Sequence, residues 1–477
     1  MAQNDRRTSV PASIALSIAL GFALIGAAPS SAVPPASQDV NPLDPPIPRV
    51  ILLTGRVTSL HKAVAHANVR ILRAGTVVAN TLSGADGTYR FSDAAPDSGV
   101  PATIAAGTYS LEAQYRTSIH PAGTVALRAG RTQRRDIELP LLALLGGAAP
   151  PRPRTTFFAT DRVANPGGTT VDNAFGNDRP IQPCSGPSAC MHLAFARVAA
   201  VGPPSLQALT VTPDMTAFVA AMRAEYPTAD TAIIFVHGFN NDFHDPAVLT
   251  ASVVAALAPS AVPIDYSWPS KHVTARYIDD ESSNQWATDH FRDFLVALLS
   301  APNAPKTVHI MAHSMGNRVA VSVLQYLHNA KPALTGHIGQ AVFAAPDVDA
   351  ATFWEAVPEM ATVAQGVTVY SSAHDEALQL SRQLHGHCRA GLTGCNDTVA
   401  LPPNANAIDA SFFHCDILGH GYWAASATIV ADITQTMKDG VMAGATLRPN
   451  LQNLGSNKYR FASAGAGGSG CAAEPRN

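Results

Sequence analysis

The sequence predicts an α/β domain, with a mostly parallel sheet covered by helices on both faces, preceded by a small all-β sandwich. Between residues 155 and 440, short β-branched runs alternate with amphipathic segments of helical length, which is typical of a parallel sheet. Between residues 49 and 140, short strand-like runs are separated by glycine-bearing turns. The length of 477 residues favours two or three domains, because one hydrophobic core rarely organises so long a chain.

Composition and charge exclude two classes of protein. The chain is 47% hydrophobic and 14% charged, so it can bury a core and is not disordered overall. Its 32 basic and 35 acidic side chains give a net charge of -3, which provides no positive field for nucleic acid. We therefore expect a globular protein with no nucleic-acid partner.

The first 48 residues have the features of an export signal and a linker. Two arginines precede an apolar run over residues 12–28, and the small residues that follow suit a signal peptidase. Residues 1–32 therefore predict a signal peptide and a secreted or periplasmic protein. The alternative is an uncleaved membrane anchor, because the run approaches the roughly 17–25 residues that span a bilayer. Residues 33–48 are rich in proline and predict an extended linker.

The predicted sandwich, residues 49–140, also carries short motifs of a known family. These are Gly84-Ala85-Asp86-Gly87, the following Thr88-Tyr89-Arg90-Phe91, and Ala106-Gly107-Thr108-Tyr109. With them the segment resembles the carboxypeptidase regulatory-like (transthyretin-like) β-sandwich family. We consider two roles for it, a spacer or a domain that contacts a cell surface, glycan or protein partner.

Six cysteines occur, an even number in a chain expected to be exported, which favours disulfides. Close spacing predicts the pairs Cys184–Cys190 and Cys388–Cys395, which leaves Cys415 with Cys471, although the sequence allows other pairings. A competing interpretation is a zinc site with ligands from His385, His387, Cys388, His414 and Cys415. We expect disulfides, and neither a metal nor a cofactor.

The α/β region lies between a second linker at residues 141–154 and a C-terminal tail at residues 441–477, which is rich in Gly, Ser and Ala. The predicted strands are 231–236, 262–266, 307–312, 339–344 and 367–371, and the predicted helices are 247–257, 279–299, 317–327 and one that starts near Trp423. Asp245 and Pro246 provide an N-cap and a first-turn proline for helix 247–257, which would bury Leu249, Val253 and Leu257.

The strand 307–312 continues into Ala312-His313-Ser314-Met315-Gly316, and an amphipathic helical segment follows. A strand, a tight turn of small residues and a helix in this order form a nucleophile elbow, in which the turn lifts a serine hydroxyl out of the sheet edge. Ser314 is therefore the predicted nucleophile. Ala312 replaces the first glycine of the usual pattern, and the alternative role for Ser314 is to cap the helix.

A serine nucleophile needs a base to take its proton and an acid to orient that base. In this arrangement they follow in the order serine, acid, histidine. Asp375, in the loop after strand 367–371, is the predicted acid, and Asp347 is its main rival. The predicted base is His420, which stands between two glycines after the last sheet-forming stretch, and His414 is the alternative.

Attack by Ser314 on a carbonyl group creates an oxyanion, which backbone amides must stabilise. One predicted donor is the amide of Met315, directly after the nucleophile. The other is the amide of Phe239, in the loop after strand 231–236, where Gly238 permits a close approach. The side chain of His237 is predicted to have a structural role.

Several ordered motifs together resemble the bacterial alpha/beta-hydrolase family of unassigned function over roughly residues 155–438. They are Phe235 to Asn240, Tyr266 to Ser270 and Ala312 to Asn317, followed by Asp375 and His420. The resemblance implies a serine hydrolase with the triad Ser314, Asp375 and His420, and it implies no particular substrate.

The sequence thus favours an exported serine hydrolase of the carboxylesterase or lipase-like type, acting on a small-molecule or lipid ester, or on a thioester, through an acyl-enzyme. The alternative is a non-catalytic envelope or surface binding protein, in which the hydrolase fold is a scaffold and the β-sandwich binds a glycan or a protein. Trp268 and Tyr277 either line the substrate pocket or belong to the core.

Overall fold

The computed structural model describes most of the chain after residue 50. The described residues are 51–59, 62–64, 67–73, 76–84, 86–92, 107–115, 118–128, 131–139, 154–165, 170–181, 184, 190–198, 206–395, 399–413, 419–440, 448 and 450–462. The predicted signal peptide at residues 1–32 and the linker at residues 33–48 lie outside them. So do His414, Cys415 and Cys471.

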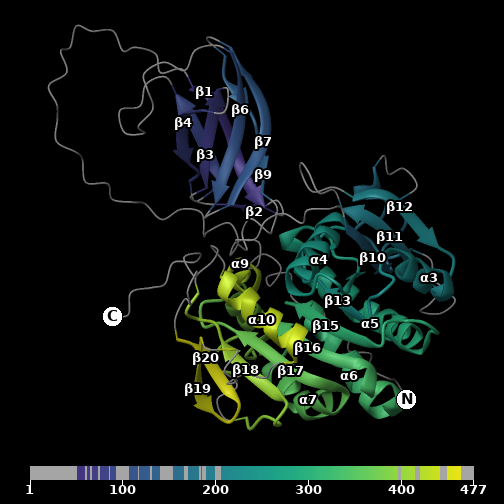
Figure 1. The fold of residues 1–477 in the computed structure, drawn as a ribbon. Helices are drawn as coiled ribbons and strands as arrows, with labels where there is room; N and C mark the ends of the chain where they lie inside the picture. The colour runs from purple at the N-terminus through teal and green to yellow at the C-terminus, as the bar shows by residue number, and fades with distance from the viewer. Residues whose placement is uncertain are drawn as a thin grey trace, which may run out of the picture.

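The N-terminal part forms two small β-sheets (Figure 1). In one sheet β1 (Ile51–Ser59) pairs with β2 (Lys62–Ala63), β5 (Thr88–Ser92), β8 (Gln133–Arg134) and β9 (Ile137–Glu138). The other has the strand order β4 (Thr76–Leu82), β3 (Asn68–Arg73), β6 (Gly107–Tyr115), β7 (Ser118–Leu127). Both sheets contribute to one apolar core, in which Leu53 and Phe91 of the first pack with Ile71 and Leu111 of the second. This segment is therefore all-β, and its resemblance to the carboxypeptidase regulatory-like family stays a prediction.

The α/β part is built on one 11-stranded sheet in the order β12-β11-β10-β14-β13-β15-β16-β17-β18-β20-β19. The strands from β10 to β20 in this order pair in parallel, while β11, β12 and β19 add antiparallel edges. The bounds are β10 Arg154–Thr160, β11 His192–Val198, β12 Leu206–Thr212, β13 Thr231–Val236, β14 Val262–Ser267, β15 Thr307–His313, β16 Ile338–Ala344, β17 Ala364–Ser371, β18 Ala405–Asp409, β19 Leu451–Gly455 and β20 Lys458–Phe461.

Helices cover both faces of this sheet. They are α3 Met215–Glu225, α4 His244–Leu257, α5 Tyr277–Ser300, α6 Gly316–Ala330, α7 Ala350–Val363, α8 Glu376–His385, α9 Tyr422–Ala425 and α10 Ala427–Asp439, with 3-10 turns at Val171–Asn173, Thr274–Arg276 and Pro332–His337. Neighbouring residues of β13 point to opposite faces. Ile233 belongs to the core that contains Leu249 of α4, whereas Ile234 belongs to the core that contains Phe291 of α5 and Leu324 of α6. The predicted two-faced α/β architecture is confirmed.

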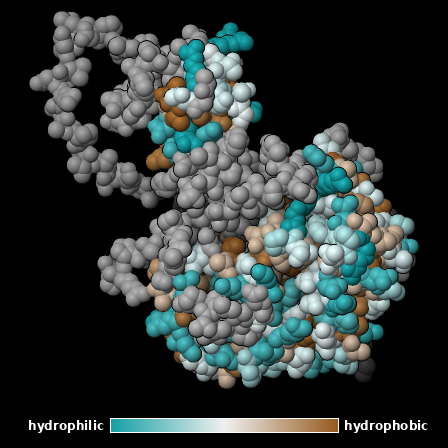
Figure 2. All heavy atoms as spheres, viewed as in Figure 1, coloured by the Kyte–Doolittle hydropathy of each residue, from teal (hydrophilic) through white to brown (hydrophobic). Residues whose placement is uncertain are grey.

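Most of the large apolar side chains of the described residues are buried in these cores. Figure 2 shows hydrophilic and hydrophobic residues mixed over the described part of the α/β region. The large hydrophobic side chains that are exposed among the described residues lie in separate elements and loops, namely Val77, Leu82, Ile181, Val211, Val273, Ile278 and Leu454. None of the described helices is both long and apolar enough to span a bilayer.

The segment predicted as a C-terminal tail, residues 441–477, contains two strands, so that boundary was wrong. Strands β19 and β20 form an antiparallel pair, and β20 extends the sheet beside β18. Tyr459 and Phe461 alternate with exposed residues and are buried, and the turn between the strands has positive φ at Gly455, Ser456 and Asn457. The α/β fold therefore continues to Phe461, because an alternating strand at residues 458–461 follows a glycine turn.

Helix α4 begins differently from the prediction. It starts at His244, so Asp245 lies in the first turn and is not the N-cap. The side chain of Asp242 instead accepts the amide N–H of Asp245 at 2.9 Å, and so satisfies one of the donors at the helix start. The predicted core contacts of the helix are confirmed, since Leu249, Val253 and Leu257 are buried.

Two of the predicted disulfides are present. Cys184 is bonded to Cys190, and Cys388 is bonded to Cys395. A zinc site with Cys388 as a thiolate ligand is thereby contradicted, because a disulfide sulfur is not available as a thiolate. The third predicted pair, Cys415 with Cys471, lies outside the described residues.

Candidate active site

Ser314 occupies the turn between strand β15 and helix α6. Its φ of 54° lies in the left-handed region, which few residues with a side chain adopt. The amide of Ser314 donates to the carbonyl of Ala344 at 3.0 Å, and its carbonyl accepts from the amide of Asp347 at 3.1 Å and from Nδ2 of Asn317 at 2.8 Å. Bonds to the neighbouring strand end and to α6 thus hold the strained turn in place.

The loop after strand β13 meets this turn at Gly238. A Cβ atom added to Gly238 would lie 2.8 Å from the Cβ of Ser314, so a larger residue does not fit. The two predicted oxyanion donors, the amides of Phe239 and Met315, come directly after Gly238 and Ser314 in the chain. Within the described part of the chain, neither amide donates a hydrogen bond to another residue. Both are therefore available to an acceptor oxygen.

The predicted acid and base lie in direct contact. Nδ1 of His420 is 2.9 Å from Oδ1 and 2.8 Å from Oδ2 of Asp375. The same carboxylate is the N-cap of helix α8, where it accepts the amide N–H of Leu378 at 2.9 Å. Asp375 is buried, and the side chain of His420 is 13% exposed. A buried carboxylate can only accept here, so it fixes the proton of the ring on Nδ1 and leaves Nε2 as the basic nitrogen.

Gly419 allows this contact. Its φ is +60°, and an added Cβ atom would lie 2.1 Å from the carbonyl oxygen of His374. A side chain at this position would therefore push the loop with His420 away from the loop with Asp375. Glycine at position 419 is therefore favoured by the lack of space for a side chain, in addition to the exposure of the loop expected from the sequence.

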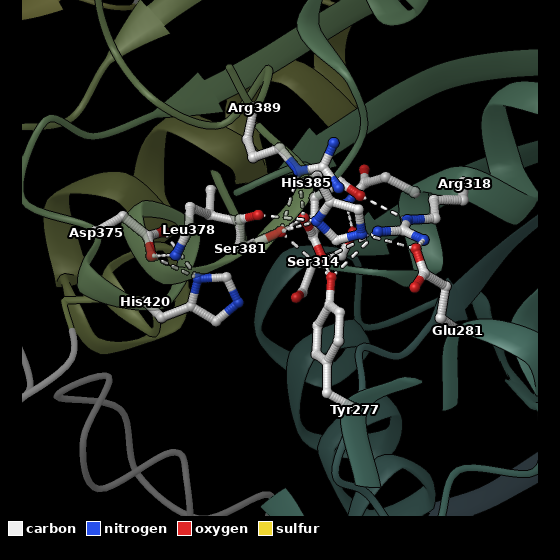
Figure 3. Close-up of polar contacts among 12 residues, drawn as sticks. Tyr277, Glu281, Ser314, Arg318, Asp375, Leu378, Ser381, His385, Arg389 and His420 are labelled. Carbon is white, nitrogen blue, oxygen red and sulfur yellow. Dashed lines mark hydrogen bonds and ion pairs between the residues drawn. The ribbon is translucent and has the colours of Figure 1, made fainter. Parts of the chain in front are cut away.

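The predicted base also approaches the segment that carries the predicted nucleophile. The ring of His313, the residue before Ser314, lies 4.8 Å from the ring of His420 between centroids, and its Nε2 is 3.4 Å from the carbonyl oxygen of His420. In Figure 3 the edge of the His420 ring that faces away from Asp375 is turned toward the middle of the view, where Ser314 is drawn. The structure brings together the loops that follow β15, β17 and β18.

The rival acid, Asp347, belongs to a separate buried cluster. Its Oδ1 accepts from Oγ of Ser381 at 2.6 Å and from Nε of Arg389 at 3.0 Å. Its Oδ2 is bonded to the hydroxyl of Tyr277 and lies 3.4 Å from Nη2 of Arg318. Figure 3 shows Arg318 on the opposite side of Ser314 from His420. The carboxylate of Asp347 is thus occupied by partners other than a histidine.

Glu281 extends this cluster toward solvent. It is bonded to Arg318 and lies 2.9 Å from Nε2 of His385. Burial raises the pKa of Glu281, but His385 and Arg318 outweigh burial and lower it to about 2. This cluster could not be predicted from the sequence, because its members come from α5, α6, α8, the loop after β16 and the loop of the second disulfide, and no local motif joins them.

Trp268 and Tyr277, which the sequence places either in the substrate pocket or in the core, have different surroundings. Trp268 is fully buried and donates from Nε1 to the carbonyl of His237 at 2.7 Å, so it belongs to the core. Tyr277 is half-buried, packs edge-on against Phe239 at 5.2 Å and is bonded to Asp347. It therefore lies beside the loop that carries a predicted oxyanion donor.

His237 is a structural residue, as predicted. Its ring stacks on Trp268 with centroids 4.9 Å apart, and its nitrogens lie 2.7 Å from the carbonyl of Gly238 and 3.1 Å from that of Trp268. Burial, together with the charge of Arg162, lowers the pKa of His237 to about 3. The ring is therefore neutral at pH 7 and carries no catalytic charge.

One group of side chains in the described residues has the spacing of metal ligands. Oxygen and nitrogen atoms of Asp242, His244 and Asp245 lie within 4.8 Å of one another. The group stands at the first turn of α4, where Asp242 accepts from the amide of Asp245 and His244 pairs with Asp245 at 3.1 Å. These contacts satisfy polar groups at the start of helix α4, which explains why the three side chains lie close together.

Comparisons with known proteins agree with this fold. Residues 216–437 match the model of the family described as alpha/beta hydrolase of unknown function (DUF900). No curated protein has a matching sequence.

Two solved structures show a distant similarity. One comes from an analysis of two prolyl endopeptidases, with 11% identity, a TM-score of 0.27, and coverage of 78% of this chain and 54% of that one. The other is oligopeptidase B from Leishmania major, with 12% identity, a TM-score of 0.27, and coverage of 79% and 51%. The chain spans about half the length of these proteins. Scores this low support no conclusion about function.

The sheet is mostly parallel, helices lie on both of its faces, and the strained turn at Ser314 joins a central strand to a helix. The family match covers this turn and the contact between Asp375 and His420. Together, these observations show that the α/β part of the chain has the alpha/beta-hydrolase fold.

Proposed function

We propose that the chain is an exported serine hydrolase that cleaves carboxylic esters through Ser314, His420 and Asp375. The observation that carries the proposal is the contact between Nδ1 of His420 and the buried carboxylate of Asp375, in loops that reach the turn of Ser314. A small-molecule or lipid ester, or a thioester, has the carbonyl group that this chemistry requires. The non-catalytic alternative gives no reason for a histidine held in this way.

In the first half of the proposed reaction, Oγ of Ser314 attacks the ester carbonyl carbon. Nε2 of His420 takes the hydroxyl proton as the bond forms, and Asp375 stabilises the imidazolium at Nδ1. The carbonyl oxygen becomes an oxyanion and accepts hydrogen bonds from the amides of Phe239 and Met315. Each such donor is worth about 3–4 kcal/mol in the transition state.

In the second half, the tetrahedral intermediate collapses and its bond to the leaving oxygen breaks. His420 returns its proton to that oxygen, so an alcohol leaves and an acyl group stays on Ser314. A water molecule then attacks the acyl carbonyl while His420 takes one of its protons. The new tetrahedral intermediate collapses, its bond to Oγ of Ser314 breaks, and His420 returns the proton to Oγ, so the acid leaves and the serine hydroxyl is restored.

The proposal that the protein is exported is supported by its two disulfide bonds. Disulfides persist in oxidising compartments and are rare in reducing ones. Both disulfides close short loops on the α/β part, at Cys184–Cys190 and Cys388–Cys395. They support a secreted or periplasmic site of action.

Labelling with a fluorophosphonate probe tests the nucleophile. This probe phosphonylates only an activated serine, so we expect the wild-type chain to be labelled at Ser314 and the Ser314→Ala variant to remain unlabelled. The control is Ser282→Ala, at an exposed position of α5, which should be labelled as fully as the wild type. A folded wild-type chain that does not react, or unchanged labelling of Ser314→Ala, would show that the nucleophile is wrong.

A further inference from the structure

The loop that carries Phe239 is held by groups from other elements. Asn240, the next residue, has a φ of +61°, so the chain reverses sharply just after the predicted oxyanion donor. A residue with a side chain pays a steric cost in this conformation and keeps it only where its surroundings hold it. The contacts around Asn240 therefore decide where the amide of Phe239 points.

Asp280, in the first turn of helix α5, supplies the main contacts. Its Oδ2 accepts the amide N–H of Asn240 at 3.0 Å and the hydroxyl of Ser270 at 2.5 Å. Its Oδ1 accepts the amide N–H of Lys271 at 2.6 Å. The carboxylate is fully buried and joins the loop after β13 to the loop after β14. Its donors come from outside its own helix, so capping α5 does not explain it.

The peptide between Gly238 and Phe239 is fixed from its carbonyl side. The carbonyl of Gly238 accepts from Nδ2 of Asn241 at 3.0 Å, and that of Phe239 accepts from the same nitrogen at 2.9 Å. The amide of Asn241 is in turn bonded to the hydroxyl of Ser270 at 3.0 Å, which is bonded to Asp280. In a trans peptide the C=O and N–H groups point in opposite directions. The N–H of Phe239 therefore points away from Asn241, while Gly238 lies against Ser314.

We propose that Asp280 is a positioning residue, whose carboxylate holds the loop 238–242 so that the amide of Phe239 faces the oxyanion formed at Ser314. The inference rests on the proposed function and adds a residue to it. Asp280 acts through the backbone and through Ser270, and it does not touch the substrate.

Other charged groups around the loop agree with this role. Arg162 is fully buried and donates to the carbonyls of Asn241 at 3.0 Å and Asp242 at 2.8 Å, so it holds the far end of the same loop. Burial raises the pKa of Asp280, and the hydrogen bonds from Ser270, Asn240 and Lys271 oppose that rise. The carboxylate thus sits in a dry site, where three donors compensate for the lost water.

Asp280→Asn tests the proposal, and Asp279→Asn is its matched control. An asparagine at 280 keeps the shape but offers one oxygen, and its NH2 group faces a donor. Both variants remove one negative charge from the first turn of α5, but Asp279 is partly exposed and pairs with Arg276 on the surface. With a chromogenic acetate ester we expect kcat of Asp280→Asn to fall about 100-fold with KM within about twofold, and Asp279→Asn to remain within about twofold of the wild type.

A second variant keeps the proposal testable if Asp280→Asn folds poorly. Asn241→Ala removes the Nδ2 group that donates to the carbonyls of Gly238 and Phe239, keeps the contact of His237 with the Gly238 carbonyl, and leaves all charges in place. We expect the same selective loss of kcat. A boronic acid that forms a tetrahedral adduct should lose affinity by the same factor in both variants, because it needs the same amide. Equal effects of Asp280→Asn and Asp279→Asn, or a change confined to KM, would overturn the proposal.

Hydrogen exchange separates this inference from the proposed function. If the wild-type chain neither reacts with the fluorophosphonate nor hydrolyses esters, the proposed function fails, and the loop can still be examined. Backbone exchange over residues 238–242, measured by mass spectrometry, should be faster in Asp280→Asn and unchanged in Asp279→Asn. Unchanged exchange in Asp280→Asn would overturn the holding role, whatever the activity.

Discussion

Replacing His420 by alanine is expected to lower kcat for a chromogenic ester by about 10⁴- to 10⁶-fold, with KM changed little. Without this imidazole the proposed base for the hydroxyl proton is lost, and a protonated serine is a weak nucleophile at neutral pH. The residual rate then comes from binding and from the amides of Phe239 and Met315. Steady-state kinetics of the purified variant, with its folding checked by circular dichroism, measure the effect.

A neighbouring histidine provides the control for this experiment. His374 precedes the acid in the chain, and its side chain has no part in the proposed reaction, so His374→Ala should retain turnover within about threefold. Near-normal turnover in His420→Ala would contradict the assignment of the base. The alternative base considered from the sequence, His414, would then be the next residue to replace.

The nucleophile turn could be predicted from the sequence because its signal is local. A strand, a turn of small residues and a helix occupy consecutive positions around Ser314, and steric rules alone give the turn its geometry. The contact between Asp375 and His420 could also be predicted, because the fold places the loops after β17 and β18 beside this turn. Asp375 and His420 are 45 residues apart, and they meet through strand order and not through any local pattern.

The buried polar groups around the site could not be predicted. Asp347 contacts Arg389, which is 42 residues away, and Tyr277, which is 70 residues away. Polar side chains in a sequence carry no sign that they will be buried together, because burial of a charge depends on partners that only the fold supplies. The same holds for Asp280, whose three donors lie in two other loops.

The edges of the sheet were also missed, for a different reason. Strand β12 buries only its two end residues and leaves most of its side chains exposed or half-exposed, so its apolar pattern is weak. Strand β19 is exposed along nearly its whole length. Edge strands lack the continuous apolar run of the central parallel strands, on which the prediction depended.

Replacing Asp347 by asparagine is expected to destabilise the fold, whereas the same change at Asp375 is expected to abolish activity. Asp347 is a buried carboxylate between Arg389 and Arg318, and removal of one partner from a buried ion pair leaves an uncompensated charge that costs about 3–5 kcal/mol. Asparagine at 375 still accepts the amide of Leu378, so helix α8 keeps its cap, but the wrong ring tautomer of His420 should lower kcat about 10⁴-fold. Urea unfolding and ester kinetics on both variants separate the two roles.

The pH dependence of unfolding provides a second, independent test of whether Asp347 stabilises the fold. Burial raises the pKa of Asp347, but Arg318 and Arg389 outweigh it and hold the pKa below the ordinary value of 3.8. The ion pairs therefore contribute fully above pH 3.8, and their contribution is lost as the pH falls through the lower pKa of the folded state. Between pH 6 and pH 3 the wild type should lose more stability than Asp347→Asn, because the variant has no charge there to protonate. An equal acid loss in both, together with full stability of Asp347→Asn at pH 7, would show that the buried cluster does not support the fold. A loss of activity in Asp347→Asn at full stability would instead return Asp347 to the role of the catalytic acid.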